Sequence, residues 1–259
     1  MMTIFDSHAH YDSDAFDADR DRLLADLPSK GVCGVINCAD TLASAARSAK
    51  LCEKYPFMYM AAGVHPENAA HVDTATLKAD LAPFLTLPKT VAVGEIGLDY
   101  HWEDACPREK QLEVFEAQLQ IAREYDLPVI VHDREAHADT MRLLQKYRPR
   151  GVVHCFSGSV ETMRETVAIG MYIGLGGVVT FKNARVPVEV AAAVPLDRLL
   201  LETDAPYMAP VPYRGKRCDS SMIPLAAEKI AALRGKTAQE ILRMTAENVY
   251  TLFQIEKNR

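Results

Sequence analysis

The chain has 259 residues, of which 49% are hydrophobic and 25% charged, and this balance excludes a disordered protein. Its formal net charge of -6 disfavours non-specific coating of nucleic acid, which needs a basic face, but leaves room for a nuclease whose positive charge is local. The six cysteines include no pair spaced C-x-x-C, which argues against a zinc knuckle or a redox motif.

The N-terminus lacks the basic and long apolar regions of a signal peptide, and no apolar run approaches the roughly 18 residues of a membrane span. We therefore expect a cytoplasmic protein with reduced cysteines. A single domain over residues 1–259 is the simplest interpretation, because no low-complexity linker or charge run divides the chain.

Apolar, β-branched runs alternate with amphipathic helical stretches along the whole chain. The runs predict strands at residues 3–7, 32–38, 58–64, 91–94, 129–132, 152–154, 171–175 and 199–202. The helical stretches lie at residues 18–29, 42–54, 74–84, 108–126, 136–147, 160–169, 188–194, 223–233 and 237–253. Eight such units favour an α/β fold, a closed (β/α)8 TIM barrel, with the last helix as an extra C-terminal helix.

The first predicted strand ends in two histidines, His8 and His10. Because side chains alternate between the faces of a strand, both imidazoles lie on the same face. Taken alone, such a pair is as compatible with an incidental strand end as with a metal site.

Four more ionisable residues close later strands: Glu95, His132, His154 and Asp204. Each one singly has an ordinary explanation, since a strand-end histidine is often hydrogen-bonded in the core and a strand-end aspartate often caps a helix. In a barrel, however, the carboxyl ends of the strands meet at one mouth, where barrel enzymes have their active sites. Burying these groups together without a metal ion would be costly, so the set predicts a metal centre.

Four imidazoles and two carboxylates are too many for one catalytic ion, which usually takes three protein ligands. The hypothesis is two ions that share one carboxylate: Glu95 bridges a first ion held by His8, His10 and Asp204 and a second ion held by His132 and His154. Two such ions can orient a phosphodiester and activate a water molecule. The imidazoles favour zinc, manganese or iron over magnesium.

At this point the motifs resemble a known family. His8-Ala9-His10, Gly94-Glu95-Ile96-Gly97-Leu98-Asp99-Tyr100 and Glu202-Thr203-Asp204-Ala205-Pro206, with Gly63-Val64-His65-Pro66, Val131-His132 and His154-Cys155-Phe156-Ser157-Gly158, are similar to the TatD family of metal-dependent deoxyribonucleases. The resemblance implies a (β/α)8 barrel that hydrolyses DNA phosphodiesters from the 3′ end with two divalent ions, magnesium or manganese. The six positions above match the metal ligands of that family.

The expected activity is thus a metal-dependent 3′ to 5′ exonuclease on single-stranded DNA, with RNA or tRNA as further possible substrates. One alternative is an esterase or deacylase, such as a D-aminoacyl-tRNA deacylase, because the same ions would polarise a carbonyl. A non-catalytic metal-binding barrel is a third. Strand 4 carries no lysine for carbamylation, which argues against hydantoinase-like chemistry. A monomer would suffice for this site.

Three residues are predicted to act in catalysis. Asp204 is the candidate general base, Glu95 the bridging carboxylate, and His65 a donor to a phosphate oxygen. Asp99 is expected to orient one of the histidine ligands.

The predicted substrate contacts lie after the last strand and after strand 4. Arg214, Lys216 and Arg217 are candidates to hold the DNA backbone. Tyr100, followed by His101 and Trp102, offers a stacking surface for bases. The segment Cys218-Asp219-Ser220 departs from the Asn-Glu-Pro of the family, which leaves the anchoring of this loop open. His71 and His137 are expected to be exposed.

Overall fold

The computed structural model describes residues 3–102 and 106–256. Within them, eight strands pair in parallel and in chain order, as the sequence predicts. The strands are β1 (Ile4–Ala9), β2 (Val32–Cys38), β3 (Met58–Ala62), β4 (Thr90–Asp99), β5 (Val129–Arg134), β6 (Gly151–Val153), β7 (Tyr172–Leu175) and β8 (Leu199–Leu201). This order and the helices between the strands make the molecule a (β/α)8 barrel.

The barrel is nearly closed between its first and last strands. A parallel bridge joins Ala9 to Ala205. The backbone N–H of Asp204 donates to the carbonyl of His8 at 2.9 Å, and that of His10 donates to Ala205 at 2.7 Å. The closing contacts therefore lie at the carboxyl ends of the strands, beside the first pair of histidines.

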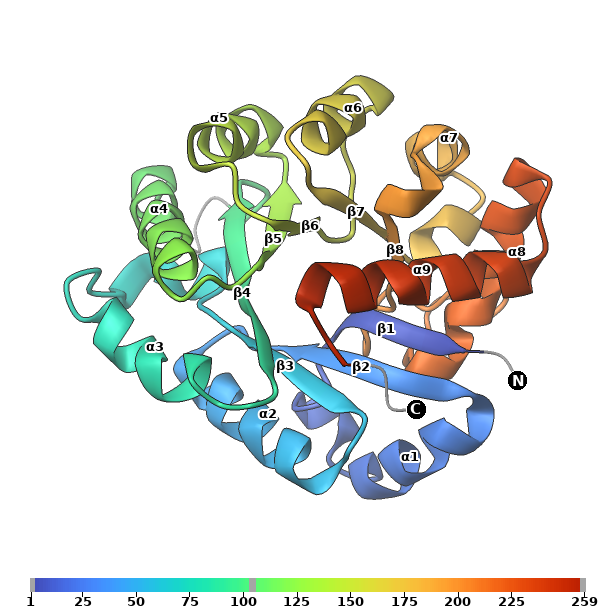
Figure 1. Ribbon diagram of the computed structural model, residues 1–259, viewed down its shortest axis with the longest axis horizontal. Coiled ribbons are helices and arrows are strands. Elements are labelled where there is room, and N and C mark those ends of the chain that lie inside the picture. Colours follow the sequence, from blue (N-terminus) through green and yellow to red (C-terminus); the bar gives the residue numbers. More distant parts are fainter. Residues whose placement is uncertain (1–2, 103–105, 257–259) are drawn as a thin grey trace.

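Helices surround the ring of strands, and the C-terminal helix crosses one end of it (Figure 1). They are α1 (Arg20–Asp26), α2 (Leu42–Lys54), α3 (Leu77–Leu85), α4 (Arg108–Glu124), α5 (His137–Tyr147), α6 (Val160–Ala168), α7 (Arg185–Ala193), α8 (Ile223–Arg234) and α9 (Ala238–Phe253). The extra C-terminal helix is α9. Across the described part of the chain, no helix has both the length and the apolar character to cross a membrane.

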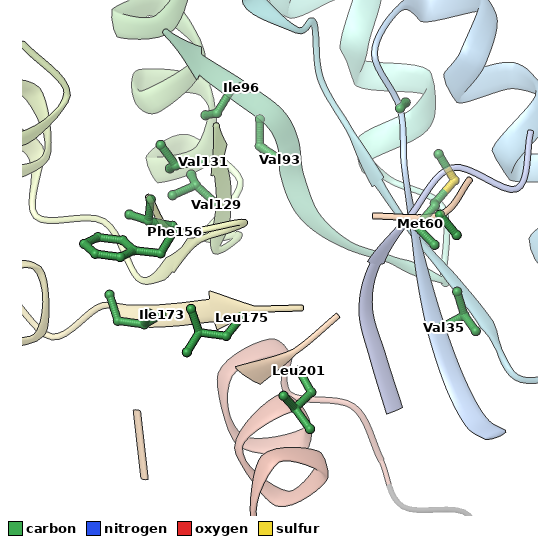
Figure 2. Close-up of a cluster of buried hydrophobic side chains, with 14 of the residues drawn as sticks. Val35, Met60, Val93, Ile96, Val129, Val131, Phe156, Ile173, Leu175 and Leu201 are labelled. Carbon is green, nitrogen blue, oxygen red and sulfur yellow. The ribbon is translucent and has the colours of Figure 1, made fainter. Parts of the chain in front are cut away.

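The two faces of the strands bury two separate apolar clusters. One face packs on the surrounding helices; Figure 2 draws 14 of these side chains and labels ten, among them Val35, Met60 and Val129. The alternate residues, such as Ile130 and Leu200, form an inner cluster that also includes α9. This alternation is the two-residue period of a strand that is buried on both faces.

The inner cluster draws on all eight strands and is completed by one helix. Its members are Phe5, Ile36, Cys38, Ala61, Val91, Ala92, Ile130, Val152, Tyr172 and Leu200 from the strands, with Ala246, Val249, Leu252, Phe253 and Ile255 from α9 and the residues after it. The amino end of the barrel is thus a packed apolar floor closed by α9.

Several predicted strand ends are wrong: β1 continues to Ala9 and β5 to Arg134, and the ends of β3 and β4 also differ. β4 continues to Asp99 because residues 96–99 pair with β5, so Glu95 lies within the strand and not at its end. β3 stops at Ala62, and Pro66 begins a short 3-10 helix that His65 caps. The predicted helix at 18–29 is divided into α1 and a 3-10 turn that contains Pro28.

Candidate metal centre

Strand periodicity aims two of the predicted strand-end groups into the barrel. His132 follows Ile130 of the inner apolar cluster by two residues, and His154 follows Val152 of that cluster by two. Because alternate residues share a face, both imidazoles lie above the apolar floor. Asp204 lies beyond the end of β8 and is held instead by its backbone N–H, which donates to the carbonyl of His8.

In β1 and β4, the number of residues between the inner apolar cluster and the site residue does not fit a regular two-residue period. An irregularity in the pairing of each strand turns the site residue inward. Phe5 of the inner cluster and His8 are three residues apart, which would place them on opposite faces of a regular strand. The register of β1 against β2 shifts between Asp6 and Ala9. The register of β4 against β5 likewise shifts within residues 93–96, around Glu95. These bulges re-aim the side chains that periodicity alone would turn away.

The first group of donor atoms joins the histidines of β1 to the two carboxylates. His8 Nε2 lies 3.0 Å from His10 Nε2 and 3.2 Å from Glu95 Oε2. His10 Nε2 lies 3.5 Å from Glu95 Oε2 and 3.4 Å from Asp204 Oδ1. The distance from His8 Nε2 to Asp204 Oδ1 is 3.7 Å.

The second group surrounds the other oxygen of the same glutamate. Glu95 Oε1 lies 2.8 Å from His132 Nδ1 and 2.8 Å from His154 Nε2, and these two nitrogens are 3.3 Å apart. His65 Nε2 is 3.4 Å from Glu95 Oε1. The structure therefore brings all six predicted ligands and His65 together, with Glu95 between the two groups.

Contacts behind the histidines fix which ring nitrogen faces the centre. His10 Nδ1 lies 2.8 Å from the carbonyl oxygen of Cys38, which can only accept, so Nδ1 donates and the neutral ring presents its Nε2 lone pair. His132 Nε2 donates to Asp99 Oδ2 at 3.0 Å, which leaves Nδ1 facing Glu95. Asp99 thus makes the orienting contact that the sequence predicts.

These donor atoms fit divalent ions. Ligands that bind one ion at about 2.1 Å lie roughly 3.0–3.4 Å apart in tetrahedral or octahedral coordination. The spacings within the two groups are of this size. Lone pairs of neutral imidazoles that face a carboxylate repel it unless a positive charge lies between them, and a metal ion supplies such a charge.

The site strongly perturbs its own ionisation. Burial lowers the pKa of His10, but the hydrogen bond to Asp204 and the charge of Glu95 outweigh it and raise that pKa to about 9. Burial opposes ionisation of Glu95, yet the neighbouring His154, His65 and His8 hold the pKa of its carboxyl well below the usual range. The carboxylates are therefore charged at neutral pH, as metal ligands must be.

A further buried carboxylate, Glu202, lies behind His154. Glu202 Oε1 is 3.6 Å from His154 Nδ1 and accepts the backbone N–H of Cys155, and Oε2 has no hydrogen-bond partner among the described residues. A Cβ atom at Gly174 would lie 2.4 Å from Glu202 Oε2, so only glycine leaves room for this carboxylate. Glu202 thus lies on the Nδ1 side of His154, whose Nε2 faces Glu95.

His65 is held differently from the other imidazoles. Its Nδ1 accepts the backbone N–H of Glu67 at 3.3 Å, so the neutral ring carries its proton on Nε2, the atom that faces Glu95. This arrangement suits a hydrogen-bond donor at the edge of the centre. His65, His10, His132, His154, Glu95 and Asp204 all border the same cavity.

The cavity has a volume of about 900 Å³ and three kinds of wall. Asp12, Asp14, Asp40 and Glu67 line it from the β1 to β3 side. Phe156, Leu175, Val178, Val179, Pro187 and Met208 form an apolar wall from the segments after β6, β7 and β8. Two cations, Arg47 and Arg134, complete it.

Of the predicted substrate contacts, His65 lines this cavity, as does Trp102 of the predicted stacking surface, whereas Arg214, Lys216, Arg217 and Tyr100 lie outside its lining. Arg217 forms two 2.7 Å ion-pair contacts with Asp19, and Arg214 covers the ring of Phe181. Lys216 is exposed. Tyr100 is 8% exposed and donates to Asp139, so it offers no free face for stacking. Whether the three cations contact substrate beyond the cavity stays a prediction.

The two histidines expected on the surface differ. His71 is exposed, as predicted. His137 is only partly exposed, because its Nδ1 lies 2.7 Å from Asp133 Oδ2 one helical turn away. Its prediction as an exposed residue is therefore wrong.

Sequence reasoning missed Glu202, which lies buried behind His154, and Arg134, which lines the cavity. The signal for both was the two-residue period: Glu202 precedes Asp204 by two residues, and Arg134 follows His132 by two.

A parallel (β/α)8 barrel with an acidic and imidazole cluster at the carboxyl ends of its strands defines a metal-dependent hydrolase. The family model described as "TatD related DNase" matches residues 5–254. The chain therefore belongs to the TatD family.

Individual relatives agree over the full length of the chain. A protein of Bacillus subtilis strain 168 named "Uncharacterized metal-dependent hydrolase YabD" is 39% identical over 255 residues, 97% of this chain and 99% of the relative. The Salmonella typhimurium protein named "3'-5' ssDNA/RNA exonuclease TatD" is 34% identical over 260 residues, 97% and 99% of the two chains. The crystal structure of YJJV, a TatD homologue from Escherichia coli K12, superposes with a TM-score of 0.90 at 35% identity and covers 98% of both chains.

Proposed function

We propose that this chain removes nucleotides from the 3′ end of single-stranded DNA by hydrolysing phosphodiester bonds at the Glu95 cluster. The observation that carries the proposal is the division of the donor atoms into two groups around the two oxygens of one glutamate. That division suits a two-ion centre, the arrangement used for in-line displacement at phosphorus. The name of the Salmonella relative supports the choice of substrate and polarity.

The chain's own residues would hold two ions in the following way: Glu95 between both, His8, His10 and Asp204 at the first, and His132 and His154 at the second. When bound, the ions would lower the pKa of a water molecule and neutralise charge on the phosphate.

Asp204 would accept the proton of the attacking water. Its side chain is 16% exposed and borders the cavity, while its backbone N–H is fixed to His8. The water oxygen forms the new bond to phosphorus, the bond from phosphorus to the O3′ of the shortened strand breaks, and Asp204 returns the proton to that oxygen. His65 donates from Nε2 to a phosphate oxygen that gains charge in the transition state.

Glu95→Gln tests this proposal because it keeps the shape of the side chain and removes its charge. Purified wild-type protein and the variant are stripped of metal, given magnesium, manganese or zinc, and incubated with 3′-labelled or 5′-labelled single-stranded DNA. Glu113→Gln, on the outer helix α4, is the matched control. We expect immediate release of the 3′ label and stepwise shortening of the 5′-labelled strand with wild type and control, and neither with Glu95→Gln.

Protein that holds two ions but cuts no DNA with any of these metals would contradict the nuclease reaction. Ester substrates, including aminoacyl-tRNA, would then be tested on the same preparation, because the cluster would still polarise a carbonyl.

A further inference from the structure

Trp102, the single tryptophan of the chain, lies at the cavity in an exposed position. Its side chain is 51% exposed, and it lines the cavity together with His132 and Asp99. An indole ring that is half exposed leaves an apolar face in water, and aromatic faces of this kind are the surfaces on which unpaired bases stack. Tyr207 is another exposed aromatic residue that lines the cavity. Trp102 follows β4 and Tyr207 follows β8, and these strands are four positions apart in the barrel, so the two rings lie on opposite sides of the cavity.

Arg134 supplies a cation beside this ring that has no ion-pair partner among the described residues. It follows His132 by two residues on β5 and therefore shares its inward face. No carboxylate of the described residues lies within ion-pair distance of its guanidinium group, whereas Arg47, the other cation of the cavity, pairs with Asp12 at 3.1 Å. Arg134 is thus the cation of this cavity whose charge is available to a ligand.

Backbone pairing brings the two side chains together. Asp99 is the register partner of Arg134, and the N–H of Tyr100 donates to the carbonyl of Arg134 at 2.9 Å. The Arg134 guanidinium carbon lies 5.6 Å from the centre of the Trp102 ring, within the range of a cation–π contact. The His101 ring packs edge-on against the indole at 4.8 Å.

We propose that Trp102 and Arg134 form a binding subsite for one unpaired nucleotide of the substrate strand, next to the bond that is hydrolysed. The exposed face of the indole stacks on the base, and the guanidinium group binds the phosphate of the same nucleotide. The assignment rests on the proposed function. It adds a reason for a single-stranded substrate, because a base that is paired in a duplex has both faces covered and cannot stack on Trp102.

Charge favours a nucleotide over an apolar protein segment at this place. Arg134 would lose the solvation of its charge under an apolar segment, whereas a phosphate compensates that loss. Four acidic residues of the cavity, Asp12, Asp14, Asp40 and Glu67, lie on the β1 to β3 side. The carboxylates of β4 and β5 already contact imidazoles: Glu95 and Asp99 contact His132, and Asp133 contacts His137. On the β4 to β5 side of the cavity, the anionic backbone of a nucleic-acid strand would therefore meet a cation, Arg134, and an aromatic ring, Trp102, together.

Because Trp102 is the only tryptophan, the intrinsic fluorescence of the whole protein reports on this one position. Metal-loaded wild-type protein is titrated with deoxyadenosine monophosphate, with deoxyadenosine, and with deoxyribose 5-phosphate. We expect saturable quenching by the nucleotide and no quenching by the sugar phosphate, which lacks a base. Arg134→Gln should raise the half-saturating nucleotide concentration about 10-fold and change that for deoxyadenosine little. Unchanged emission at saturating nucleotide would overturn the subsite.

Steady-state degradation of single-stranded DNA gives a second, independent readout. Trp102→Ala should raise KM about 10- to 100-fold with little change in kcat, because stacking stabilises substrate and transition state alike. Trp102→Phe should restore most of the affinity. A strand whose 3′-terminal nucleotide is abasic should show no such difference. Tyr213→Ala, which removes an aromatic ring of similar exposure outside the cavity, and Arg164→Gln, on the outside of α6, are the controls.

Failure of the proposed function and failure of the subsite give different results in these experiments. Absence of degradation by the wild-type protein contradicts the proposed function, and quenching by the nucleotide would still support the subsite. Normal degradation with the same KM in Trp102→Ala and wild type would overturn the subsite and leave the proposed function standing.

Discussion

The two ends of the barrel interior are built on the same strands and have opposite chemistry. At the amino end, inward side chains such as Phe5, Ile130 and Leu200 pack against α9 and exclude water. At the carboxyl end, two to four residues further along the chain, the inward side chains are imidazoles and carboxylates. The change from apolar floor to metal centre thus takes only a few residues of each strand.

The comparison separates stability from function. Apolar burial at the amino end stabilises the barrel, whereas burying charged groups at the carboxyl end costs free energy unless they are compensated. Two residues of the carboxyl end, Asp204 and Cys155, have left-handed backbone, with φ values of 59° and 42°. Such left-handed backbone costs a non-glycine residue about 1 kcal/mol or more, and the packed floor sustains it.

The largest expected effect is at the centre of the cluster. Glu95→Gln should lower kcat by about 1,000-fold or more, because the charge shared by both groups of ligands is lost. In metal-free protein, the same substitution should change the free energy of unfolding little. Turnover and urea unfolding of one preparation measure both. A Glu95→Gln variant that keeps a tenth of wild-type turnover would show that the carboxyl end does not depend on this charge.

Leu200→Ala tests the opposite end. Removal of a fully buried side chain from the inner cluster should lower the free energy of unfolding by about 2–5 kcal/mol, because the floor cannot close over the cavity. The kcat per folded molecule should stay within about twofold of wild type at low temperature. Loss of turnover without loss of stability would show that the floor takes part in the chemistry.

Asp99→Asn has an intermediate effect. The amide no longer fixes the proton on His132 Nε2, so we expect metal affinity at the second group to fall about 10- to 100-fold. Metal titration of stripped protein measures this, with Asp126→Asn, on an exposed aspartate, as control. Equal affinities for Asp99→Asn and wild type would mean that packing alone orients His132.

The smallest effect concerns the ion pair of Arg217 with Asp19 outside both ends. The hydrogen bond from Arg217 lowers the pKa of Asp19 below its ordinary value of about 3.9. The pair therefore stabilises the fold above that value, and this contribution is lost as the pH falls through the lower folded pKa. Arg217→Gln should slightly lower the unfolding midpoint at pH 7 and leave it unchanged at pH 2. A large drop in the DNA affinity of Arg217→Gln would instead show that Arg217 contacts the substrate.

The barrel and the inward direction of most site residues were predictable, because both follow from local patterns. Alternation of apolar runs with helices predicts the strand order, and the two-residue step from Ile130 to His132 or from Val152 to His154 predicts which face each imidazole occupies. These features depend on residues close together in the chain.

What could not be predicted depends on partners that are distant in sequence. Arg217 looks like a free cation until the fold places Asp19 beside it, and Tyr100 looks like an exposed ring until Asp139 accepts its hydroxyl. The bulge that turns Glu95 inward is set by pairing with β5. Such choices are made by tertiary contacts, which a single sequence does not display.

The measurement that tests the central claim most directly counts bound ions and turnover on one sample. Stripped protein is titrated with manganese while bound metal and release of a 3′-terminal nucleotide are followed together. The two-group geometry predicts that wild type binds two ions per chain, that turnover appears as the second is bound, and that Glu95→Gln does neither. Full turnover in the stripped protein, or two ions bound by Glu95→Gln with wild-type turnover, would contradict the assignment of Glu95 as the shared ligand.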